Sequence, residues 1–94
     1  MEKDIEKKFT KAVSHVGGIA LKFVSPSYNG MPDRIVLLPK GRIGFVEIKD
    51  RGQKPRAIQR AMHRKLTMLG FKVFILDRPE KIEKIIKEIG GDDL

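Results

Sequence analysis

The chain has 94 residues, no cysteine and a formal net charge of +8. This length predicts one small domain, residues 1–94, with a thin core, and the missing cysteine excludes disulfides and thiolate zinc sites. The two histidines are too few for a histidine-rich metal centre. A charge this positive is typical of nucleic-acid binders; the alternative is a basic protein without a polyanionic partner.

The chain contains no apolar run long enough to span a bilayer, and its N-terminus is charged rather than signal-like. We therefore expect a soluble cytoplasmic protein without a membrane partner.

Hydrophobic periodicity predicts a first helix over residues 4–16, which Gly17-Gly18 ends. A strand is expected over 19–24, then a loop over 25–31 and two β-rich segments, 34–38 and 43–49. The second half adds a helix from Pro55 to before Gly70, an apolar run at 71–76 and a helix opened by Pro79.

The run at 71–76 is expected to be a buried central strand. The element order, helix, three strands, helix, strand, helix, predicts an α/β (α+β) fold with a mixed sheet flanked by helices. Whether the last segment, 82–94, packs on its own core or against a second subunit stays open.

Acidic residues are scarce in the basic middle of the chain: between Lys7 and Leu76 they are Asp33, Glu47 and Asp50. Pro39-Lys40-Gly41 fits a three-residue hairpin loop. That loop pairs residue 38 with 42 and places Asp33 opposite Glu47. A two-residue loop would turn Glu47 to the other face, unless a bulge, for example at Gly44, corrected it.

Opposed strand residues have Cβ atoms about 4.5–5.5 Å apart, a span that one cation can bridge. We expect Asp33, Glu47 and the backbone carbonyl of Ile48 to hold Mg²⁺, which keeps positions open for phosphate and activates water. Lys49 shares a face with Glu47 and could orient or deprotonate the water or stabilise the transition state. The alternative is an ordinary ion pair between Glu47 and Lys49 on an exposed strand.

Two acids on the first helix, Glu2 and Glu6, could approach this cluster, although an acid near a helix N-terminus is also explained by the macrodipole. Gln59 borders the apolar stripe of the second helix, and His63 is interpreted as facing solvent or DNA. The expected DNA contacts are Lys22, Arg34, Arg51, Lys54, Arg56 and Arg60. Those from 51 to 60 lie near the N-terminus of the second helix, which also attracts phosphate; the alternative is an ordinary solvated basic face, and Lys22 could likewise be a solvated strand residue.

The ordered set of motifs resembles the virus-type replication-repair nuclease (VRR-NUC) family of the PD-(D/E)XK superfamily. The matching residues are Ile5-Glu6, Lys22, Gly30-Met31-Pro32-Asp33-Arg34, Glu47-Ile48-Lys49 and Gln59. The resemblance implies a restriction-endonuclease-like αβββαβ core, here with an extra C-terminal helix. It also implies Mg²⁺- or Mn²⁺-dependent cleavage of DNA, with Asp33 and Glu47 as metal ligands, Lys49 as catalytic residue, and Glu6 and Gln59 in the site.

Small stand-alone members of the family resemble phage and viral proteins. The resemblance therefore implies a homodimer that acts on branched DNA, such as a four-way junction, inside a host cell. Larger relatives carry further DNA-binding domains, for which this chain has no room. The alternatives are a flap or restriction-type nuclease of the same fold, or a non-catalytic DNA-binding module.

Overall fold

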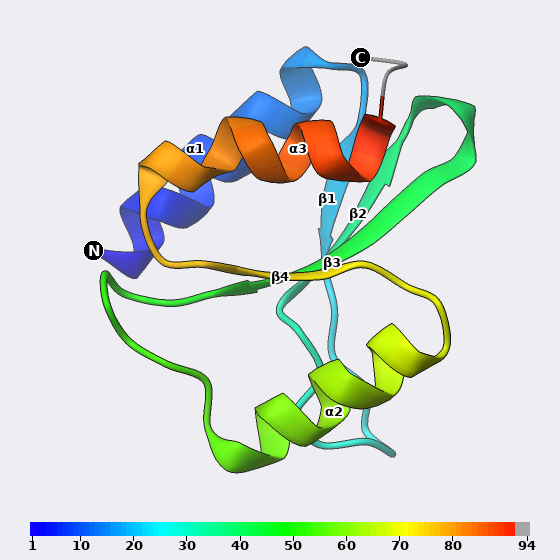
Figure 1. The fold of residues 1–94 in the computed structure, drawn as a ribbon. Coiled ribbons are helices and arrows are strands. Elements are labelled where there is room, and N and C mark those ends of the chain that lie inside the picture. The colour runs from blue at the N-terminus through cyan, green and yellow to red at the C-terminus, as the bar shows by residue number, and fades with distance from the viewer. Residues whose placement is uncertain (92–94) are drawn as a thin grey trace.

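A computed structural model describes residues 1–91, which form a mixed four-stranded sheet between helices (Figure 1). The elements follow in the order α1 (Glu2–His15), β1 (Ile19–Lys22), β2 (Arg34–Leu38), β3 (Arg42–Ile48), α2 (Ala57–Met68), β4 (Val73–Leu76) and α3 (Ile82–Gly90). Short 3-10 turns at Pro39–Gly41 and Pro79–Lys81 precede β3 and α3. The predicted αβββαβ order with an extra C-terminal helix is confirmed.

The strands lie in the order β1-β2-β3-β4. The first three are antiparallel, and β4 runs parallel to β3 after the crossover through α2. Of the strands formed by residues 1–91, β4 lies at one edge, so the prediction of a central strand was wrong. Its apolar run has another cause: Phe74 and Leu76 pack toward the main core, while α2 packs against the same strand from the other face. A continuous apolar run indicates that both faces of a strand are buried, and does not indicate that the strand has a neighbour on each side.

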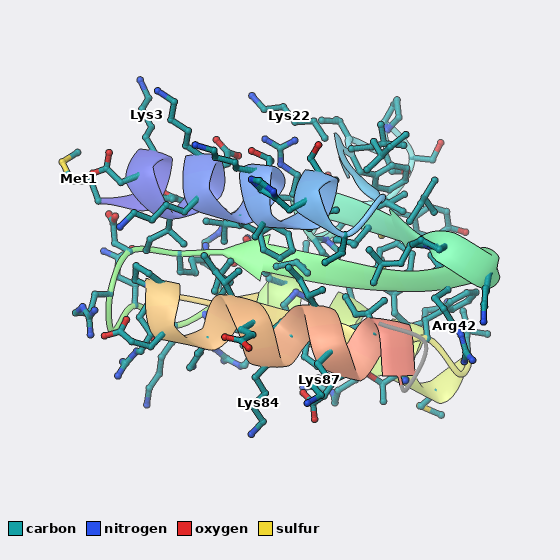
Figure 2. The ribbon with its side chains drawn as sticks, turned by 90° about the horizontal axis from the view of Figure 1, so that it is seen from above. Met1, Lys3, Lys22, Arg42, Lys84 and Lys87 are labelled. Atoms are coloured by element: carbon teal, nitrogen blue, oxygen red, sulfur yellow. The ribbon has the colours of Figure 1, made fainter. Side chains whose placement is uncertain are left out.

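The main core lies on one face of the sheet, under α1 and α3, whereas α2 covers the opposite face (Figure 1). Figure 2 shows α1 and α3 side by side across the sheet, with Lys84 and Lys87 pointing outward from α3. The core combines the apolar stripe of α1, the inward side chains of β2 and β3, and four isoleucines of α3. In chain order these residues are Ile5, Phe9, Val13, Val36, Val46, Ile48, Ile82, Ile85, Ile86 and Ile89. The segment α3 therefore packs on this chain's own core, while residues 92–94 lie outside the described part.

Element boundaries differ from the predictions by a few residues. The helix α1 begins at Glu2 and ends before Gly17, whose φ of 83° suits a glycine. The helix α2 begins two residues after Pro55, because Arg56 is extended (φ −69°, ψ 164°) and acts as the N-cap residue. The backbone N–H of Arg56 donates to Gln59 Oε1 at 2.8 Å. This bond gives a partner to a backbone N–H that has none within the helix.

The hairpin between β2 and β3 has the predicted register. Leu38 pairs with Arg42, and pairing continues without interruption to Arg34 opposite Val46. Gly44 is therefore not a bulge; it pairs with Val36, and a Cβ on it would lie 2.6 Å from Ile89 Cδ1. Its small size instead lets α3 approach the sheet closely.

Candidate active site

Asp33 and Glu47 meet at the end of the β2–β3 ribbon, as the hairpin register requires. Asp33 directly precedes β2, and its Oδ2 accepts a hydrogen bond from the Ile48 N–H at 2.7 Å. Along β3 the side chains of Val46 and Ile48 enter the main core, so Glu47 points to the opposite face, toward α2. Asp33 and Glu47, which the predicted hairpin register places opposite each other, therefore lie close together in the structure.

The Glu47 carboxylate is enclosed, with the residue only 1% exposed. Gln59 Nε2 donates to its Oε2 at 3.1 Å, and Lys49 Nζ lies 3.6 Å from the same oxygen. The other oxygen, Oε1, is buried and has no hydrogen-bond partner among residues 1–91; His63 Nε2 is 3.7 Å away. A buried Glu47 does not fit the alternative of an ion pair on an exposed strand.

Burial and neighbouring negative charges together determine the electrostatics of this cluster. Burial, followed by the neighbouring Asp33 carboxylate, raises the pKa of Glu47 to about 7, although Lys49 opposes the shift. Burial and the negative charges of Asp33 and Asp50 also raise the pKa of Glu2 on α1. This helix acid is therefore affected by the same carboxylates. A cation between the carboxylates would relieve this repulsion.

The donor set fits a hard divalent cation. It consists of the neighbouring carboxylates of Asp33 and Glu47, and the Oε1 atom of Glu47 is buried without a hydrogen-bond partner in residues 1–91. In residues 1–91 no group of three or more His, Asp or Glu side chains is arranged to hold a metal ion. Mg²⁺ in proteins is usually held by one or two carboxylates and keeps several waters.

Gly30 explains how the loop before Asp33 reaches α2. Its φ is 84°, and a Cβ there would lie 2.5 Å from the backbone oxygen of Ile58 in the first turn of α2. A side chain at this position would push the loop away from the helix that carries Gln59. Gly30 thus helps to bring Asp33 and Gln59 to the same cluster.

Glu6 lies on α1 and forms an ion pair with Arg34 at 3.1 Å. It lines a small hollow together with Lys22, Phe23, Val24 and Asp33. The Arg34 side chain is only 11% exposed, and its Nη1 also donates to the carbonyl of Ala20 at 2.9 Å. The structure therefore gives no support to Arg34 as a DNA contact, because its guanidinium is turned inward and holds Glu6.

The other predicted basic contacts are on the surface. Lys22, Lys54 and Arg56 are exposed, and Figure 2 shows Lys22 pointing outward along the same edge as Lys3. Arg51 is exposed but paired with Glu80 at 3.1 Å. Arg60 donates through Nη1 to the carbonyl of Pro55 at 2.7 Å, so it braces the start of α2.

His63 does not face solvent, so that half of the interpretation was wrong, while a position facing DNA stays a prediction. Its side chain is 12% exposed and turned toward Glu47. Burial lowers the pKa of His63, and the positive charge of Lys49 lowers it further. The sequence spacing could have indicated this position, because His63 follows Gln59 by four residues and so lies on the same face of the helix.

None of the helices formed by residues 1–91 is both long and apolar enough to cross a bilayer.

This arrangement of sheet, helices and acidic cluster defines a domain of the restriction-endonuclease-like class. A solved structure described as "VRR_NUC domain" has a TM-score of 0.86 to this chain and is 31% identical to it, covering 92% of this chain and 94% of that chain. A protein of Acyrthosiphon pisum secondary endosymbiont phage 1, described as "Putative nuclease p44", is 50% identical over 76 residues, which are 81% of this chain and 82% of the phage protein. No family model matches. The chain belongs to the VRR-NUC family.

Proposed function

We propose that this VRR-NUC chain is a homodimeric, Mg²⁺- or Mn²⁺-dependent endonuclease that cuts branched DNA, with the four-way junction as its preferred substrate. One observation carries the proposal. The Ile48 N–H donates to Asp33 Oδ2 at 2.7 Å, which fixes this carboxylate at the end of β3. Beside it, Lys49 Nζ lies 3.6 Å from Glu47 Oε2. Two carboxylates can hold a metal ion that activates water and stabilises charge on a phosphodiester, and an amine beside them can stabilise the same charge.

Asp33, Glu47 and the Ile48 carbonyl would hold the cation. When bound, it supplies Lewis-acid stabilisation of the phosphoryl oxygens and a more acidic water. Gln59 keeps the Glu47 carboxylate in place through its 3.1 Å hydrogen bond. The amine of Lys49 can orient the attacking water and stabilise charge that develops on the phosphate.

Glu6 takes part through the hollow that it lines with Asp33 and Lys22. Its role is to orient solvent on the α1 side of the cluster, while Arg34 fixes its carboxylate. Glu2 is a second acid on α1, and the charge of Asp33 adds to the effect of burial in raising its pKa.

DNA binding is supported by the net charge of +8 and by basic side chains around the site. The loop from Lys49 to the start of α2 joins the site directly to the exposed residues Lys54 and Arg56. The phage protein similar to this chain is described as a nuclease. Its source supports the further proposal that this chain acts in the cytoplasm of a phage host.

A second copy would cover an exposed apolar row on the sheet. Ile19, Leu37 and Ile43 lie opposite one another across β1, β2 and β3, and are 57%, 39% and 37% exposed. Leu21 extends the same face and is 45% exposed. Like charges on a basic protein oppose association, so an uncharged apolar face is the favourable place for two copies to meet. A two-fold dimer would present two sites to two DNA strands.

The test is incision of a labelled four-way junction by the purified protein, with and without Mg²⁺ or Mn²⁺. Paired symmetric nicks that depend on the metal are the expected result. Preferential cutting of flaps or linear duplex would replace the junction with one of those substrates. DNA binding without any cutting, combined with no metal binding, would reject the nuclease in favour of a binding module.

A further inference from the structure

The helix α2 presents two side chains to the buried Glu47 carboxylate. Gln59 and His63 are four residues apart and therefore lie on one helix face. Gln59 Nε2 donates to Oε2 at 3.1 Å, whereas His63 Nε2 lies 3.7 Å from Oε1. Each side chain thus faces a different oxygen of the same carboxylate.

The gap between His63 and Glu47 is unusual because both facing atoms are unsatisfied. Glu47 Oε1 and His63 Nε2 are buried, and neither has a hydrogen-bond partner in the described part of the chain. A separation of 3.7 Å is slightly too long for a hydrogen bond. Hydrogen bonds in active sites without ligands are often long and shorten when the site is filled.

We propose that His63 is a positioning residue, whose neutral imidazole donates from Nε2 to Glu47 Oε1 so that α2 holds both oxygens of the carboxylate. The inference rests on the proposed function, in which Glu47 is a metal ligand. A carboxylate oxygen has two acceptor positions, so the bond from His63 leaves room for a cation on Oε1. Hydrogen bonds of this kind to metal-binding carboxylates orient them, and their loss costs about 10–100-fold in metal affinity or activity.

The first experiment measures Mn²⁺ binding by titration calorimetry on the full chain. His63→Leu removes both ring nitrogens and replaces the imidazole with an apolar side chain of similar size, and we expect Mn²⁺ affinity to fall about 10–100-fold. His63→Gln restores an N–H donor and should recover most of the affinity. His15→Leu is the matched control, because His15 is exposed on α1 beyond the other face of the sheet; it should bind as the parent does.

A second measurement needs neither a variant nor a metal. Long-range ¹⁵N–¹H NMR on the imidazoles, recorded at mildly alkaline pH, reports which ring nitrogen carries the proton. His63 should be the Nε2–H tautomer, with a shift distinct from that of exposed His15. A proton on Nδ1 with a bare Nε2 would overturn the proposal even if the Leu variant failed to fold.

The experiments distinguish failure of the positioning role of His63 from failure of the proposed nuclease function. If the parent binds Mn²⁺ and cuts DNA, and His63→Leu does both equally well, the positioning role is wrong and the proposed function stands. If the parent neither binds Mn²⁺ nor cuts, the proposed function fails, while the tautomer still decides whether His63 donates to Glu47.

Discussion

The backbone N–H of Ile48 donates a 2.7 Å hydrogen bond to Asp33 Oδ2. This single contact joins the loop before β2 to the last residue of β3, next to Glu47. It continues the hairpin pairing with a side chain in place of a backbone carbonyl. The contact holds one proposed metal ligand beside the other before any cation is present.

Replacing the proposed ligands should abolish cleavage and spare DNA binding. Asp33→Asn and Glu47→Gln keep side-chain volume but remove negative charge. Outer hydrogen-bonding partners of a metal site are worth about 10–100-fold, so loss of a ligand should lower the cleavage rate at least about 100-fold. Single-turnover cleavage and DNA mobility shifts measure the two properties. Full activity in both variants would remove these residues from the site.

Lys49 should affect chemistry more than binding. Lys49→Met removes the amine 3.6 Å from Glu47 Oε2 while keeping an unbranched side chain. Loss of one group that stabilises transition-state charge costs about 10²–10³-fold, and we expect a fall in cleavage rate within that range, with Mn²⁺ binding retained. Lys54→Met is the control, since Lys54 is exposed on the following loop. It should weaken DNA affinity and make binding less salt-dependent, but leave the rate at saturating DNA unchanged.

Gly30→Ala should destabilise the protein more than Gly52→Ala. Both glycines have positive φ, 84° and 79°, and a left-handed conformation costs other residues about 1–2 kcal/mol. Only at Gly30 would the added Cβ also meet the α2 backbone, 2.5 Å from the Ile58 oxygen, whereas nothing lies within 4 Å at Gly52. Overpacking adds about 1–3 kcal/mol. Urea unfolding measures the difference, and equal losses in the two variants would mean that the loop moves aside freely.

Asp77 should make the fold sensitive to acid. Hydrogen bonds from Arg78 and Lys81 lower its pKa from 3.8 to about 2. Because the folded-state pKa is depressed, this contribution to stability is present above pH about 4 and is lost as the pH falls toward 2. Asp77→Asn should therefore unfold at lower temperature than the parent at neutral pH, and the gap should close near pH 2.

The control for Asp77 is Glu80→Gln, which removes the exposed pair with Arg51. Exposed pairs contribute little, so its melting temperature should stay near that of the parent at every pH. A gap for Asp77→Asn that widened in acid would contradict the assignment.

The apolar row on the sheet should govern association. Leu37→Lys places a charge in the middle of the row, opposite both Ile19 and Ile43. Light scattering after gel filtration should show the parent as a dimer and this variant as a monomer. Met68→Lys is the matched control, because Met68 is an 87% exposed apolar residue on α2, outside the row. If Leu37→Lys stayed dimeric, the two copies would have to meet elsewhere.

Several parts of the site could be predicted from the sequence because they depend on neighbours along the chain. Loop length and the glycine at position 41 determine the pairing of β2 with β3, and that pairing places Asp33 beside Glu47. Strand alternation then places Lys49 on the same side as Glu47. The helices were predictable for the same reason, since their apolar stripes repeat with the helical period.

Tertiary structure alone decided the contacts between elements distant in sequence. The pairing of Arg34 with Glu6 depends on how α1 lies over the sheet, and the turn of His63 toward Glu47 depends on how α2 packs on the other face. The edge position of β4 likewise follows from which strand the crossover reaches. Periodicity along a chain shows which side of an element is buried. What that side meets is determined by the packing of whole elements against one another.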